Sequence, residues 1–432
     1  MRLLVVCALC LVHLGASQSK LPDEDWGYAN VRPNAYLFWW FYGMADPAKR
    51  DTAPVVVWLQ GGPGASSTGF GNFEEIGPLD INLNPRPINW VQSANILFVD
   101  SPVGAGFSYV TSPGAYVQKD QQIGVDLVGM LQSFLAQHPS VTLNQNPFWI
   151  FCESYGGKET LSFGVALAEA IKKGEIKINF KGVALGDSWI SPGDFLASYS
   201  EYLYGISEVD NKGKALIDTS ANAALAAIQA QQWLKATQIW SDNQNDIENA
   251  TFGINVYNVL DRSQDQQERK GGLTLKQRVR KILEAYEGDP LTDLMNGKIR
   301  EKLKIIPANV TWSQESDDVF NNLAMDFMKP AIAWADSLIS QNYNVVVYSG
   351  NLDLICCTTG TLKWMKQLSW SQYPTFDAQP RTPIMDNNGN IVAFRKQYLN
   401  FQFFTILSAG HMVPSDQPYA AKSMLDLVIN GQ

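Results

Sequence analysis

The sequence predicts an α/β fold: a mostly parallel central sheet with helices on both faces and a helical cap insertion. Three observations carry this prediction. The chain has 432 residues, of which 46% are hydrophobic and 17% charged, so it can bury a large core. Short β-branched runs alternate with helical stretches, which is typical of parallel strands joined by crossover helices. The alternation stops over residues 193–329, where a helical insertion is expected.

Six apolar runs are predicted to be strands. They cover residues 54–59, 95–100, 147–152, 180–185, 344–349 and 401–407. Between the second and third runs, residues 123–135 place aliphatic side chains near one helical face, and another helix is predicted to start near residue 157. Helical patterns fill the long gap between the fourth and fifth runs. We interpret this gap as a cap inserted into one sheet, and a separate helical domain is the alternative.

The N-terminus predicts a secretory signal peptide over residues 1–17. Arg2 precedes an apolar stretch, and the small residues Gly15, Ala16 and Ser17 follow it. The stretch is short for a bilayer-spanning anchor, so we expect no membrane attachment after its removal. The first part of the core is then predicted over residues 18–192, the mainly helical cap over 193–329 and the second part of the core over 330–432.

Charge and residue counts exclude several functions. Lys and Arg total 33 against 42 Asp and Glu, a net charge of −9, which argues against a nucleic-acid partner. Cleavage of the signal peptide would leave two histidines and three cysteines, too few for a zinc site built from them. We therefore expect no metal and no cofactor, and at most one disulfide. Asn249 and Asn309 each begin an Asn-x-Thr sequon and are predicted glycosylation sites in a secretory protein.

A serine lies where the third predicted strand turns into a helix. The stretch reads FCESYGGK, with Ser154 at its centre. Strand, sharp turn and helix is the setting of a nucleophile elbow, in which a serine projects from a strained turn. The motif of such an elbow is Gly-x-Ser-x-Gly. Here Gly156 occupies the last position, but Cys152 replaces the first glycine. Taken alone, Ser154 is explained slightly better as a helix N-cap among turn glycines.

A nucleophilic serine needs a base and an orienting acid. His138 precedes a proline at a predicted helix end, and we interpret it as structural. His411 follows the last predicted strand in a Gly-flanked loop, which suits a general base, although a surface-loop histidine is the alternative. Asp353 lies just past the fifth strand, so the order Ser154, Asp353, His411 is that of α/β-hydrolases. Three such residues, each after a strand, are far more specific than one.

The chemistry also needs donors for the oxyanion that forms on the attacked carbonyl. The first strand is followed by GGPGASS, whose glycines let backbone N–H groups approach a substrate oxygen. We assign the N–H of Gly62 and that of Tyr155, the residue after the serine. A tight turn without a ligand is the alternative explanation of these glycines.

Taken together, the motifs of this chain resemble those of a known protein family. The stretches WLQGGPGASS, FEEIGPL, LFVDSPVGAGFSY, FCESYGG, GNLDLIC and AGHMVP look like the successive blocks of the serine carboxypeptidases. GVALGDSWISP and KLKIIP make it most similar to the retinoid-inducible branch. The resemblance implies the α/β-hydrolase fold, the triad named above, and release of single residues from peptide or protein C-termini at acidic pH. It further implies a lysosomal or secreted protein, and it leaves open whether the chain is a monomer or a homodimer.

The family recognises the free α-carboxylate of its substrate with an amide and an acidic side chain. The resemblance places these roles on Gln60 and Glu153, with Trp58 nearby and Glu75 as a carboxyl partner of Glu153. Protonated Glu153 could donate a hydrogen bond to the substrate, and burial beside a second carboxyl would raise its pKa. The chain departs from the family pattern at Gln60, Cys152 and Ala65, where Asn, Gly and a disulfide-bonded Cys are usual.

Two other functions are weighed against carboxypeptidase activity. One is esterolysis or acyl transfer by the same triad. The other is binding of a partner, with catalysis incidental. Labelling of Ser154 by a fluorophosphonate with cleavage of esters alone would favour the first, and retention of biological activity by Ser154→Ala would favour the second.

Overall fold

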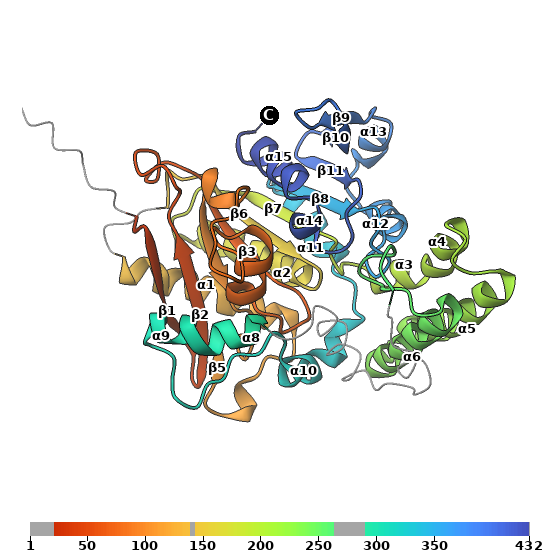
Figure 1. The fold of residues 1–432 in the computed structure, drawn as a ribbon, viewed down its shortest axis with the longest axis horizontal. Helices are drawn as coiled ribbons and strands as arrows, with labels where there is room; N and C mark the ends of the chain where they lie inside the picture. Colours follow the sequence, from red (N-terminus) through yellow and green to blue (C-terminus); the bar gives the residue numbers. More distant parts are fainter. Residues whose placement is uncertain (1–20, 139–142, 263–289, 432) are drawn as a thin grey trace, which may run out of the picture.

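A long, twisted sheet forms the centre of the molecule (Figure 1). The structure is a computed structural model that describes residues 21–138, 143–262 and 290–431, so the predicted signal peptide lies outside it. The strand order in the sheet is β1-β2-β4-β3-β6-β7-β8-β11-β10-β9, and β5 pairs with β2.

The six predicted strands form the middle of this sheet. They are β3 (Val55–Leu59), β4 (Asn95–Val99), β6 (Phe148–Glu153), β7 (Phe180–Gly186), β8 (Asn344–Gly350) and β11 (Phe401–Ile406). All five pairings among them are parallel. The predicted parallel sheet is therefore confirmed. All residues of β3, β4 and β6 are buried, which is why these strands read as continuous apolar runs.

Antiparallel strands, which the sequence did not reveal, extend both edges of the sheet. One edge holds β1 (Glu24–Arg32), β2 (Ala35–Tyr42) and the short β5 (Tyr109–Val110), and the other holds β9 (Thr382–Met385) and β10 (Ile391–Tyr398). Most of β1, β9 and β10 is partly or fully exposed, so their composition is mixed and no apolar run marks them.

Helices cover both faces of the sheet, as predicted. In β3, Val55, Val57 and Leu59 pack into one hydrophobic cluster, whereas Val56 and Trp58 pack into another on the opposite face. The first face is covered by α1 (Asp120–Gln137), α2 (Gly156–Lys173) and α11 (Ile332–Ser340). The second is covered by η1 (Ser67–Ile76), α14 (Val413–Asp416) and α15 (Pro418–Ile429).

The insertion between β7 and β8 contributes helices to two regions (Figure 1). Helices α5 (Asn211–Gln229) and α6 (Trp233–Thr251) pack as a pair beyond the sheet, next to α3 (Pro192–Leu196), α4 (Tyr199–Gly205) and α10 (Asp317–Phe327). Helices α8 (Pro290–Leu294), η5 (Met295–Ile299) and α9 (Arg300–Leu303) instead lie across β1 and β2, where the Trp26 indole donates to the carbonyl of Leu303. The division into core and cap stays a proposal.

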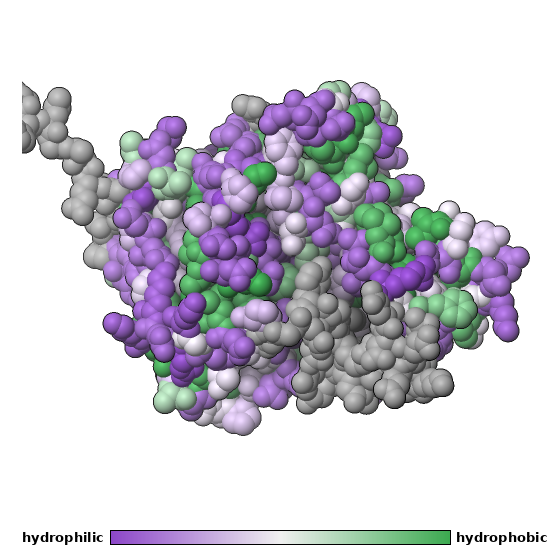
Figure 2. All heavy atoms as spheres, in the orientation of Figure 1, coloured by the Kyte–Doolittle hydropathy of each residue, from purple (hydrophilic) through white to green (hydrophobic). Residues whose placement is uncertain are grey.

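Short helices complete the described chain: η2 (Trp90–Gln92), η3 (Pro113–Ala115), α12 (Thr358–Met365) and α13 (Tyr373–Asp377). Among the helices described, none is long and apolar enough to cross a membrane. The face in Figure 2 is largely hydrophilic and is interrupted by separate hydrophobic areas.

Candidate active site

The candidate residues gather where the parallel strands end. Parallel strands present their carboxyl ends at one edge of the sheet, and ligands of α/β proteins bind there. Ser154 follows β6, Asp353 follows β8 and His411 follows β11, while Gln60 and Gly62 follow β3. These four strands lie within the parallel part of the sheet. The fold therefore brings together residues that are far apart in the sequence.

Ser154 has the strained backbone of a nucleophile elbow. Its φ is +58°, a left-handed value that side-chain-bearing residues seldom adopt, and its N–H donates to the carbonyl of Gly186 at 3.0 Å. Helix α2 begins two residues later. The loop after β3 approaches so closely that a Cβ on Gly61 would lie 2.4 Å from the Ser154 Cβ. Only glycine fits at residue 61, because any side chain would push this loop away from Ser154.

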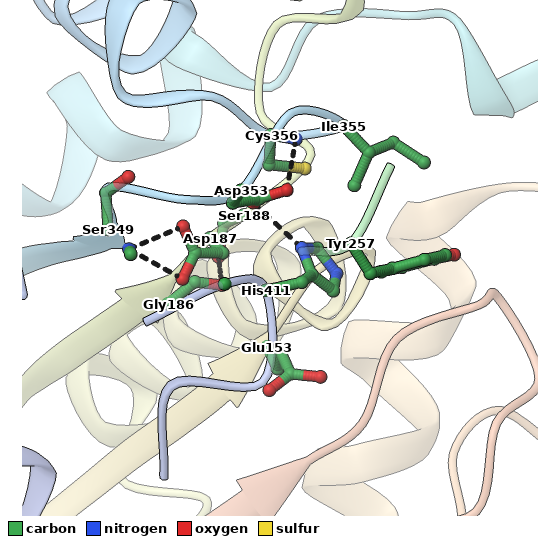
Figure 3. A network of polar contacts seen from close by, with 12 residues as sticks. Glu153, Gly186, Asp187, Ser188, Tyr257, Ser349, Asp353, Ile355, Cys356 and His411 are labelled. Atoms are coloured by element: carbon green, nitrogen blue, oxygen red, sulfur yellow. Dashed lines mark hydrogen bonds and ion pairs between the residues drawn. The ribbon is translucent and has the colours of Figure 1, made fainter. Parts of the chain in front are cut away.

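Asp353 and His411 form a buried pair (Figure 3). The His411 Nδ1 lies 2.9 Å from the Asp353 Oδ2, and the other carboxylate oxygen accepts the backbone N–H of Cys356 at 3.2 Å. On the insertion side, the backbone N–H of His411 donates to the backbone carbonyl of Tyr257 at 2.7 Å. The Tyr257 ring packs edge-on against the imidazole, with the ring centroids 4.7 Å apart. These contacts orient the imidazole and leave Nε2 for a reacting group.

Ser154 and His411 line the same cavity. The His411 Nε2 is buried and has no hydrogen-bond partner among the described residues. In the described structure the His411 Nε2 makes no hydrogen bond to Ser154. Catalytic hydrogen bonds are often long without substrate and become shorter when substrate binds. The cavity is also lined by Gln60, Gly61, Gly62, Glu153 and Tyr155.

Both predicted oxyanion donors belong to this cavity. Gly62 has a φ of +105° in the loop after β3, and Tyr155 lies between Ser154 and the first residue of α2. The Tyr155 ring is buried, and its hydroxyl donates to Asp120 at 2.7 Å, which holds the turn in place. The N-terminus of α2 adds the positive end of a helix dipole beside the site. This setting suits a developing negative charge.

The four residues assigned to carboxylate recognition form one buried hydrogen-bond chain. The Trp58 Nε1 donates to the Gln60 Oε1 at 2.8 Å. The Gln60 Nε2 then donates to Glu75 and to Glu153, both at 2.9 Å. Gln60 and Glu153 line the cavity, whereas Trp58 and Glu75 stand behind them as supports. The Gln60 amide thus bridges both carboxyl groups.

Burial raises the pKa of both glutamates. For Glu153 the pKa lies well above its ordinary value of 4.5, mainly because of burial and then because of the Glu75 charge. Burial raises the pKa of Glu75 to about 7. Two adjacent buried carboxyls cannot both ionise cheaply, so the pair stays protonated in mildly acidic solution. Protonated Glu153 can donate a hydrogen bond.

The cysteines take no part in a disulfide within the described residues, where Cys152, Cys356 and Cys357 are all buried and free. The Cys152 Sγ lies 3.4 Å from the carbonyl of Ala184 and 3.7 Å from the Ser188 hydroxyl. It therefore packs against β7. Burial raises the Cys152 pKa to about 11, so this side chain is a neutral thiol.

Two other predictions concern residues outside the site. Both imidazole nitrogens of His138 are engaged, at 2.8 Å from the Phe134 carbonyl and 2.7 Å from the Asp25 carboxylate, which fits the structural interpretation of this histidine. The side chains of Asn249, near the end of α6, and Asn309 are exposed. Their glycosylation stays a prediction.

One group of three residues described by the structure, Asp353, Cys356 and His411, has ligand atoms within 4.8 Å of one another. The pairing of Asp353 with the His411 Nδ1 accounts for this cluster. It belongs to the candidate triad, and the expectation of no metal stays a prediction.

Sequence reasoning missed three polar residues of this region: Asp187, Tyr257 and Glu315. Asp187 directly follows β7, so its position at the carboxyl end of a predicted strand was a usable signal. Tyr257 and Glu315 come from the insertion and line the cavity. Nothing in the local sequence distinguishes these two from other polar residues of the insertion.

Asp187 supports the loop that carries Asp353. Both of its carboxyl oxygens accept the backbone N–H of Gly350, at 3.0 and 3.1 Å, and Figure 3 shows it beside Asp353. Burial, and next the charge of Asp353, raise the pKa of Asp187 well above its ordinary value of 3.8.

We expect Asp187→Ala to lower the free energy of unfolding by about 1–3 kcal/mol, because the buried Gly350 N–H loses its acceptor. Urea unfolding of the purified protein measures this change. Asp187→Asn is the matched control, since it retains an acceptor oxygen and can still donate to Asp353, and it is expected to lose less stability. Equal stability of Asp187→Ala and the wild type would contradict the role of this contact.

The parallel sheet, the strained serine after β6 and the buried acid–histidine pair define the class of protein. It is an α/β-hydrolase with a candidate Ser–His–Asp site.

Comparison with known proteins gives the family. Residues 17–431 match the profile of the serine carboxypeptidases, peptidase family S10, and the chain belongs to that family. It is 44% identical to the retinoid-inducible serine carboxypeptidases of Mus musculus and Homo sapiens, over 94% of this chain and 91% of each relative. It is 40% identical to serine carboxypeptidase-like 51 of Arabidopsis thaliana, over 93% of this chain and 91% of that protein.

A solved structure supports the fold. The crystal structure of a prohormone-processing carboxypeptidase from Saccharomyces cerevisiae superposes with a TM-score of 0.81, at 20% identity, over 95% of this chain and 92% of that one. The resemblance read from the sequence motifs and the predicted α/β-hydrolase fold are both confirmed.

Proposed function

We propose that this protein releases single residues from the free C-termini of peptides at acidic pH, through an acyl-enzyme formed on Ser154. The observation that carries this proposal is the buried Gln60–Glu153–Glu75 cluster at the edge of the cavity that Ser154 and His411 share. A triad alone is common to many hydrolases. A protonated carboxyl and an amide beside it favour a substrate that ends in a carboxylate.

The reaction would proceed in two steps. The Ser154 Oγ attacks the carbonyl carbon of the last peptide bond while the His411 Nε2 takes its proton, and Asp353 stabilises the imidazolium that results. The backbone N–H groups of Gly62 and Tyr155 stabilise the oxyanion. His411 then protonates the leaving amino group, the C–N bond breaks, and water activated by His411 hydrolyses the acyl-enzyme.

Recognition of the terminus would explain why internal bonds resist. Gln60 and protonated Glu153 would hydrogen-bond the substrate carboxylate, with Trp58 and Glu75 holding them in place. An internal peptide bond offers no carboxylate at this position. Acidic conditions match a lysosomal or secreted protein, which the predicted signal peptide and the two sequons also favour.

Digestion of a matched pair of peptides tests the proposal. One peptide ends in a free carboxylate and the other in an amide, with the same sequence, and products are followed by mass spectrometry between about pH 4 and 6. We expect stepwise loss of C-terminal residues from the free acid and at least about tenfold slower cleavage of the amide, because the amide lacks a charged partner for the cluster. Equal rates on both peptides, or internal cleavage, would contradict it.

A further inference from the structure

The cavity is lined by a second carboxyl group besides Glu153, and the proposed reaction does not use it. Glu315 belongs to the insertion, in the segment before α10, and it lines the cavity together with Ser154. Its Oε1 is buried and has no hydrogen-bond partner among the described residues. Leaving a buried polar atom unpaired is costly, so such an atom in a binding cavity points to a ligand that pairs with it.

The backbone on either side of Glu315 is fixed against the loop after β3. The N–H of Ser66 donates to the carbonyl of Gln314 at 3.0 Å, and the N–H of Ser316 donates to the carbonyl of Gly64 at 3.1 Å. These two bonds bracket Glu315. They hold its carboxyl group in the cavity at a defined place.

That place is next to the proposed oxyanion donors. The Glu315 Oε1 lies 3.1 Å from the point that a Cβ on Gly62 would occupy. A group bound by Glu315 would therefore lie close to the carbonyl under attack. The substrate residues near that carbonyl are the two that flank the scissile bond.

The surroundings favour a cation over a neutral group. The cavity lining includes Glu153 and Glu315 but no Lys or Arg of the described chain. Aromatic residues including Tyr257, Phe320 and Phe327 also line the cavity, and aromatic faces attract cations. Burial, and next the charge of Asp317, raise the Glu315 pKa to about 8. A bound cation would favour the ionised carboxylate and offset its desolvation.

We propose that Glu315 binds a positively charged substrate side chain, Lys or Arg, in one of the two residues that flank the scissile bond. This inference deepens the proposed carboxypeptidase function and rests on it. Glu315 would thus be a residue that determines specificity, distinct from the groups that recognise the terminal carboxylate.

Four peptides test the proposal, each with Arg or its nearly isosteric neutral analogue citrulline at the last or the next-to-last position. We expect the wild type to prefer Arg to citrulline in kcat/KM by about tenfold or more at one of these positions, because a desolvated charge pair contributes strongly. The Glu315→Gln variant should lose this preference, so that its kcat/KM for the Arg peptide no longer exceeds its kcat/KM for the matching citrulline peptide. The two positions distinguish which substrate residue is bound.

Asp317→Asn is the matched control. It removes an acidic charge two residues away, from an exposed residue that does not line the cavity, and it should retain the preference for Arg. A wild type that treats Arg and citrulline alike at both positions would overturn the proposal. An Arg preference that Glu315→Gln leaves intact, or that Asp317→Asn also abolishes, would do the same.

A binding measurement separates this inference from the proposed function. The Ser154→Ala protein is titrated with the same four peptides, and tighter binding of Arg over citrulline is expected to vanish when Glu315→Gln is added. If no peptide is trimmed by the wild type, the proposed function fails, and this Glu315-dependent difference in binding would still support the inference. Its absence would overturn the inference by itself.

Discussion

Ser154→Ala is expected to lower kcat for a free-acid peptide by about four to six orders of magnitude, the loss typical of a serine nucleophile. The variant lacks the atom that forms the acyl-enzyme, so the remaining hydrogen-bond donors can accelerate only attack by water. Single-turnover digestion followed by mass spectrometry measures the loss. Residue 154 has a positive φ, and alanine must adopt this backbone conformation just as serine does. We therefore expect the variant to retain the fold.

A double variant makes this test sharper. Ser154 and His411 act as one unit in the proposed mechanism, so Ser154→Ala combined with His411→Ala should lose no more activity than the single variants do. Ser188→Ala is the control. It removes a buried hydroxyl that donates to the carbonyl of Gly186 at 2.9 Å and does not line the cavity. Multiplied losses in the double variant, or a Ser154→Ala protein within tenfold of wild type, would contradict the triad.

The discrimination between a free carboxylate and an amide is expected to fall as the pH rises through about 7. Below that pH the Glu75–Glu153 pair is protonated, and Glu153 can donate to the substrate carboxylate. Loss of the proton leaves negative charge that repels this carboxylate, whereas an amide terminus carries no charge to repel. We expect the ratio of kcat/KM values to drop by about tenfold between pH 5 and 8, because hydrogen bonds to charged groups are worth about 1.5–3 kcal/mol.

Glu153→Gln retains a donor and removes the carboxyl partner whose hydrogen bond lowers the Glu75 pKa, so Glu75 stays neutral to higher pH. Its ratio of free-acid to amide kcat/KM should therefore change little over the same pH range. Glu74→Gln is the matched control: it does not line the cavity and should keep the wild-type loss of discrimination, with the midpoint slightly lower because the Glu74 charge is a minor cause of the raised Glu75 pKa. A wild-type ratio that rises with pH, or a Glu153→Gln profile identical to that of the wild type, would contradict the role assigned to Glu153.

The features that could be predicted from the sequence are those marked by patterns of contiguous residues. Six fully or mostly buried strands read as apolar runs, and all six were found in the parallel part of the sheet. Of the antiparallel strands, β1, β9 and β10 were missed because they expose many side chains and carry no such run, whereas β2 is a buried apolar run that the prediction overlooked. The candidate triad was visible for a related reason, since each of its members follows a predicted strand.

What the sequence by itself determined was the family, the parallel core and the order of the candidate triad, since motifs and burial patterns are properties of contiguous residues. Tertiary structure alone decided that Gln60 bridges two buried carboxyls, that Asp187 supports the Asp353 loop and that Glu315 lies against the loop of Gly62. The physical reason is that desolvation and hydrogen bonding depend on what surrounds a group in space. In each of these contacts the neighbours come from distant parts of the chain.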